Sequence, residues 1–74
     1  MIVKTSEYEN THGKKPRGRA LWAITARGSD GRGRYTTETY YINGSLPYAK
    51  KEAVRQMKQE IGGVKMVTSL EILP

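Results

Sequence analysis

A glycine-rich segment, GSDGRG at residues 28–33, separates two stretches that have the composition of β-strands. In the first stretch, residues 19–27, the large apolar side chains of Trp22 and Ile24 fall on the same face of a strand. The second, residues 34–42, is rich in the β-branched and aromatic residues that suit a pleated surface. The Asp-Gly step and the two other glycines between the stretches can adopt the positive φ that a chain reversal requires. The sequence therefore predicts an antiparallel hairpin, and this hairpin determines which side chains face the core and which face solvent.

Alternation along the two strands assigns their side chains to opposite faces. We expect one face to enter the core through Trp22, Ile24, Tyr40 and Ile42, because exposing a Trp would be costly in a chain with so few apolar residues. The other face would present Leu21, Ala23, Thr25 and Arg27, together with Tyr35 or Tyr41.

The hydrophobic period changes after the hairpin, where apolar residues recur at the four-residue spacing of a helix with one buried stripe. Pro47 suits the first helical turn, with Ser45 or Leu46 at the cap, and Gly62 offers the left-handed conformation that ends many helices. The stripe consists of Ala49, Ala53, Met57 and Ile61, with Val54 beside it.

Residues 64–73 alternate again and predict a strand with one buried face. Its inward set is Val64, Met66, Leu70 and Ile72, against Lys65, Ser69 and Glu71. Residues 1–9 are a weaker strand candidate, because their apolar residues cluster at the start. We therefore predict a single small domain over residues 1–74, of α+β class. Its small antiparallel sheet has three or four strands in the order β-β-β-α-β, with one helix packed on one face.

That arrangement leaves the second face of the sheet open, and the charge of the chain suggests a use for it. The formal net charge is +6, which favours acidic partners. Residues 13–35 contain seven of the thirteen Lys and Arg residues and one acid, Asp30.

Arginine and tyrosine on an open sheet can pair with phosphates and stack on bases, whereas basic loops can follow a phosphate backbone. The alternative is that these residues form only solvated loops and solvent-facing strand positions. Lys51, Arg55 and Lys58 could add a second phosphate-binding ridge on the helix or form an ordinary solvated face. The candidate nucleic-acid-binding residues are Lys14, Lys15, Arg17, Arg19, Arg27, Arg32, Arg34, Tyr35 and Tyr41.

Catalysis, cofactors and metal sites find no support in the sequence. There is no cysteine, the one histidine, His12, lies in a polar segment, and the glycines of residues 28–33 lack the ending of a phosphate-binding loop. No stretch resembles a membrane span or a signal peptide, so we expect a cytoplasmic protein that is not an enzyme.

Two resemblances of layout bear on function. Residues 20–73, with the segments LWAIT and EAVRQM, resemble small phage-encoded inhibitors of host RNA polymerase, which implies a host protein machine as partner. Residues 19–61 resemble the arm-binding domains of phage integrases, which implies a sheet face in the DNA major groove.

We therefore expect a small basic non-catalytic binding module, of phage or mobile-element type, that meets a nucleic acid through its Arg-rich hairpin. The alternative is a phage-type inhibitor that uses the same surface against an acidic patch of a host complex, such as RNA polymerase or a defence complex. A dimer joined through an exposed strand edge is a third possibility.

Overall fold

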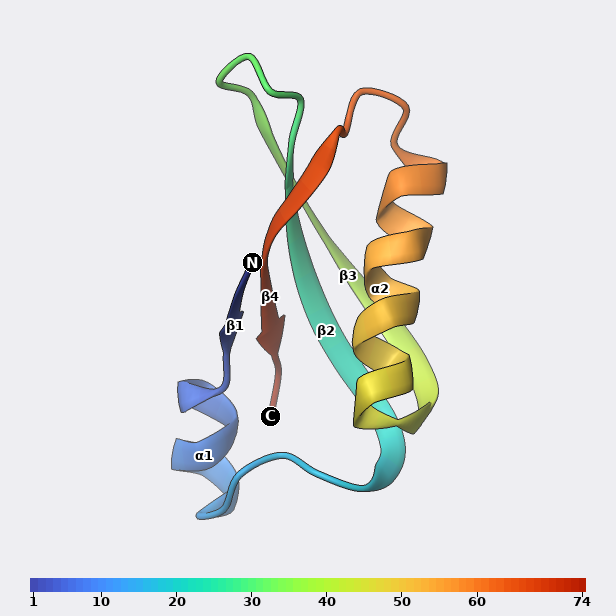
Figure 1. Cartoon of the computed structure of the whole chain (residues 1–74). Coiled ribbons are helices and arrows are strands. Elements are labelled where there is room, and N and C mark those ends of the chain that lie inside the picture. Colours follow the sequence, from blue (N-terminus) through green and yellow to red (C-terminus); the bar gives the residue numbers. More distant parts are fainter.

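The predicted hairpin is the longest part of a four-stranded sheet in the computed structural model, which describes all of residues 1–74 (Figure 1). The elements, in chain order, are β1 (Ile2–Lys4), α1 (Ser6–His12), β2 (Arg19–Ser29), β3 (Tyr35–Ser45), α2 (Leu46–Glu60) and β4 (Met66–Ile72).

The strands lie in the order β1-β4-β2-β3. β2 is antiparallel to both β3 and β4, and α2 packs across one face of the sheet. The predicted α+β class and the single helix packed on the sheet are confirmed. The sheet is mixed, however, because β1 runs parallel to β4. Parallel neighbours need a long connection, and here that connection is nearly the whole chain.

The N-terminal segment differs most from its prediction. Its strand is confined to Ile2–Lys4, and a second helix follows at once. The Thr5 hydroxyl donates to the Glu9 carboxylate (2.6 Å), and Gly13 ends the helix in the left-handed conformation. The strand prediction over residues 1–9 was therefore wrong beyond residue 4, because the hydrogen bond from Thr5 to Glu9 and the glycine cap stabilise about two turns of helix there.

The core forms where the stripe of α2 meets the facing side of the sheet. Trp22 is buried and its indole N–H donates to the Gly44 carbonyl oxygen (3.1 Å), so both strands of the hairpin are tied at this point. The predicted core positions of the hairpin are confirmed. The buried apolar residues are Trp22, Ile24, Ala26, Tyr40, Ile42, Leu46, Ala49, Ala53, Met57, Val64, Leu70 and Ile72.

Helix α2 begins as the sequence predicts and ends differently. The Ser45 hydroxyl accepts from the backbone N–H of Tyr48 (3.4 Å), and Pro47 stands in the first turn. At the other end Ile61, in an extended conformation, follows the last helical residue, and Gly62 does not have a positive φ. The expected left-handed glycine cap is therefore absent. Neither helix is long and apolar enough to cross a membrane.

A β-bulge changes the phase of β4. Gly28 is the register partner of Val67 and Arg27 is the partner of Ser69, so β4 contains one extra residue, Thr68. The Thr68 hydroxyl donates to the backbone carbonyl of Arg27 (3.1 Å). A bulge reverses the faces on which the flanking side chains lie.

This reversal corrects one core assignment. Leu70 and Ile72 are fully buried as expected, but Met66 lies on the other side of the bulge and is 54% exposed. Val67 takes its place and packs against the core. The strict alternation assumed for Val64, Met66 and Leu70 was therefore wrong at Met66.

Candidate nucleic-acid interface

The face of the sheet opposite α2 is open, as predicted. Tyr41 and Leu21 are 72% and 68% exposed, although both lie within the two eleven-residue strands of the hairpin. Thr25 and Thr39 are register partners closer to the hairpin turn, and their hydroxyls lie 2.9 Å apart. The open face is thus a mixed surface of aromatic, aliphatic and hydroxyl groups with ordered neighbours.

The hairpin turn is organised by the one acid of the Arg-rich segment. One carboxylate oxygen of Asp30 accepts from the backbone N–H groups of Arg32 (2.7 Å) and Arg34 (3.1 Å). Gly31 and Gly33 have positive φ values of 80° and 94°, which side chains rarely adopt. The carboxylate oxygen of Asp30 therefore fixes the turn backbone from which the two arginine side chains project.

Next to the turn, an arginine and a tyrosine of the open face contact each other. The guanidinium carbon of Arg27 lies 4.0 Å from the centroid of the Tyr35 ring, the distance of a cation–π contact. Both side chains stay exposed. This pair links the turn to the open face.

The remaining candidates lie at the opposite end of the molecule. Lys14, Lys15 and Arg17 belong to the loop between α1 and β2, and Arg19 opens β2. Figure 1 shows this loop at one end of the sheet and the hairpin turn at the other. The eleven residues of β2 span roughly 35 Å between the two ends, at about 3.3 Å per residue.

We call Arg27, Arg32 and Arg34 the turn cluster, and Lys14, Lys15, Arg17 and Arg19 the loop cluster. Sequence neighbours are thereby divided between two sites, while Tyr41 lies on the face between them. All nine candidate residues are exposed.

None of these basic side chains is neutralised within the chain. The single ion pair joins Arg55 to Glu52 on α2, and the Arg55 side chain also donates to the Gln59 amide oxygen (2.7 Å). The hydrogen bond from Arg55 lowers the pKa of Glu52. Arg55 is thus engaged within α2, so the predicted helix ridge retains only Lys51 and Lys58 as unpaired exposed charges.

One basic residue near the turn cluster was missed by the sequence analysis. Lys65 precedes β4, and its backbone N–H donates to the carbonyl of Ser29 (2.8 Å), the last residue of β2. Its exposed side chain therefore starts from the same end of the sheet as Arg32 and Arg34. Only the pairing of β4 with β2 brings it there, and nothing in the local sequence indicates that pairing.

No group of three or more His, Cys, Asp or Glu side chains is close enough to hold a metal ion. His12 stacks on Tyr8, with 4.1 Å between ring centroids. Comparisons with protein-family models, curated proteins and solved structures found no match to this chain. The two resemblances of layout therefore remain predictions, and only the geometry of the chain itself bears on its function.

Proposed function

We propose that this protein is a non-catalytic nucleic-acid-binding module whose interface is the open face of the β2–β3 hairpin. One observation carries the proposal: an uncovered sheet face with exposed tyrosines is bounded at both ends by basic side chains that have no acidic partner in the chain.

Phosphate contacts supply most of the affinity in this proposal. The turn and loop clusters lie roughly 35 Å apart along β2, so they reach two separate stretches of a phosphate backbone. Arginine suits this role because its planar group can donate two parallel hydrogen bonds to one phosphate.

The face between the clusters contacts the bases. Tyr41 offers its ring for stacking, and the ring of Tyr35 is held in place by Arg27. The Thr25 and Thr39 hydroxyls can donate to or accept from base edges or phosphates.

An acidic surface of a host protein complex, such as RNA polymerase or a defence complex, would meet the same basic clusters. A pull-down from lysate separates this rival from the proposal. The tagged chain is incubated with lysate, with and without a nuclease that digests both DNA and RNA, and bound nucleic acid and bound proteins are quantified separately.

We expect the parent to retain nucleic acid, to lose it on digestion, and to release with it any proteins that were held through it. The Arg32→Ala/Arg34→Ala variant should retain less nucleic acid than the parent. A matched variant, Lys50→Ala/Lys51→Ala, removes the same charge from α2 on the other side of the sheet and should behave as the parent does. Capture of a particular protein that survives digestion and depends on Arg32 and Arg34 would replace the proposal with the rival.

A further inference from the structure

Helix α2 covers only part of the sheet face on which it lies. A four-stranded sheet is roughly 19 Å wide at about 4.8 Å per strand, whereas a helix with its side chains covers about 10–12 Å. α2 packs mainly on β2 and β3 and reaches the nearer side of β4. Figure 1 shows β1 lying outside the area beneath the helix. A strip of the sheet beside α2 is thus left without a second helix.

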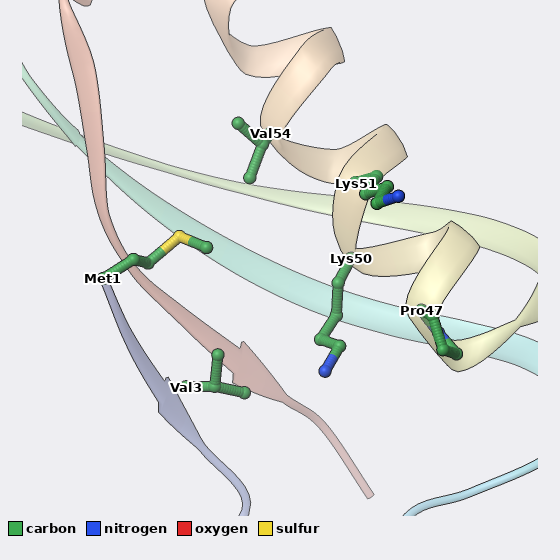
Figure 2. Close-up of a pocket in the computed structure, with 6 residues that line it drawn as sticks. All are labelled: Met1, Val3, Pro47, Lys50, Lys51 and Val54. Carbon is green, nitrogen blue, oxygen red and sulfur yellow. The ribbon is translucent and has the colours of Figure 1, made fainter.

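This strip forms a groove of about 480 Å³ between the first half of α2 and β1 (Figure 2). Its apolar walls are Met1, Val3 and Val54, with Pro47 at one end. Met1 and Val3 are 69% and 40% exposed, although Val3 lies on the helix side of a strand. The volume lies within the roughly 300–1,000 Å³ that is typical of ligand-binding clefts.

The charge around the groove has one sign. Lys50 and Lys51 complete its lining, neither is ion-paired, and no acidic side chain lines it. In Figure 2 the side chain of Lys50 extends from α2 toward β1. By helical periodicity Lys58 lies further along the same side of α2, whereas Glu52 and Glu60 lie on the side that faces β3.

We propose that this groove binds an acidic amphipathic helix of a partner protein, laid alongside α2 as the second helix of the layer. The free width is about 7–9 Å, close to the roughly 8–10 Å that separates the axes of packed helices, so one further helix can lie beside α2. The walls accept apolar side chains at positions i, i+3 or i+4, and i+7 of the incoming helix. Glutamates or aspartates flanking those positions meet Lys50 and Lys51. The groove and the open face lie on opposite sides of the sheet, so this inference does not depend on nucleic-acid binding.

A pair of designed peptides tests the proposal. The acidic peptide is a capped helix of about 18 residues, long enough to be helical in isolation. It has Leu at i, i+3, i+4 and i+7 and Glu at the flanking positions on an Ala background. The basic peptide has Lys in place of every Glu. Binding is followed by titration calorimetry and by amide chemical-shift mapping on the whole chain.

We expect the acidic peptide to bind at least tenfold more tightly than the basic one and to shift amides in residues 1–4 and 47–54. Lys50→Glu/Lys51→Glu should reverse the preference between the peptides, and both substitutions are on the helix surface, so the fold should persist. Val54→Asp should abolish binding of both peptides. Arg32→Ala/Arg34→Ala should bind the acidic peptide as the parent does.

Equal binding of both peptides, or shifts confined to the open face, would overturn the proposal. So would a failure of the charge reversal to change the preference in a variant whose melting temperature matches that of the parent. If oleate shifts the groove amides while the acidic peptide does not, the groove binds a small anionic amphiphile and the helix proposal is wrong. The parent chain could also bind neither peptide and self-associate with increasing concentration in a way that Val54→Asp removes. That result would assign the groove to a second copy of the chain and would also contradict the proposal.

Discussion

Asp30 illustrates how a single side chain sets the geometry of the turn cluster. Its carboxylate accepts hydrogen bonds from two backbone N–H groups, so Arg32 and Arg34 project from an ordered turn. Ordering a side chain on binding costs about 1 kcal/mol, or roughly fivefold in affinity. The contribution of Asp30 to turn geometry can be separated from the effect of its negative charge by comparing two substitutions.

Asp30→Asn keeps an oxygen acceptor and removes the negative charge, so it should bind nucleic acid at least as tightly as the parent. Asp30→Ala removes the charge and the acceptor together, and we expect about fivefold weaker binding than for Asp30→Asn. Fluorescence anisotropy with one labelled duplex and one labelled single strand measures both. Equal affinity of the two variants would show that turn geometry does not contribute.

Gly28 lies in close contact with Met57 of α2 and with Val64, which follows the helix. A Cβ atom at this position would lie 2.7 Å from a methyl carbon of Val64 and 2.8 Å from the Met57 sulfur. Gly28→Ala should therefore lower the free energy of unfolding by about 1–3 kcal/mol through overpacking. Gly62→Ala is the matched control, since nothing lies within 4 Å of its Cβ position and its φ is not positive. Urea midpoints of the two variants should differ clearly, and coinciding midpoints would contradict the placement of α2 over Gly28.

At the scale of whole elements, the parts that the sequence predicts are those whose signals are local. The hairpin follows from alternation and from the Asp-Gly step, and α2 follows from the spacing of Ala49, Ala53 and Met57. Helix α1 was not predicted, because its seven residues bury no side chain and therefore carry no apolar stripe. The bulge in β4 was not predicted, because the extra residue is defined only by the register with the partner strand β2.

The bulge makes a prediction about two methionines. Met57 is fully buried under the sheet, so Met57→Ala should cost about 2–4 kcal/mol of unfolding free energy. Ile72→Ala should cost a similar amount, because Ile72 is also fully buried. Met66→Ala deletes the same side chain from an exposed site and should change stability by less than about 0.5 kcal/mol. Thermal or urea unfolding measures all three, and a large loss at Met66 would mean that β4 pairs without the bulge.

For the candidate site, the sequence identified which residues are exposed and on which face they lie. It did not identify their division into two clusters, because that division depends on the length of β2, nor the arrival of Lys65 beside the turn, which depends on strand pairing. The sequence likewise did not predict the contact between Arg27 and Tyr35, because the two residues come together only through the register of the hairpin.

The molecule as a whole is elongated, 38 × 21 × 15 Å, with its long axis available for a linear polyanion. Its two sheet faces differ in character. One presents tyrosine and hydroxyl groups between the basic clusters, and the other carries α2 with the groove beside it. If each face has its own partner, removing charges from one face should leave binding at the other unchanged.

The sharpest test of binding through the open face is the dependence of nucleic-acid affinity on salt concentration. If the two clusters together neutralise about four phosphates, log affinity should fall against log salt with a slope near −3 to −4. Arg32→Ala/Arg34→Ala should flatten the slope by about two units, because each lost phosphate contact removes about one. Lys50→Ala/Lys51→Ala should keep the parental slope. A slope near zero for the parent, or equal flattening by both double variants, would contradict binding through the open face of the hairpin.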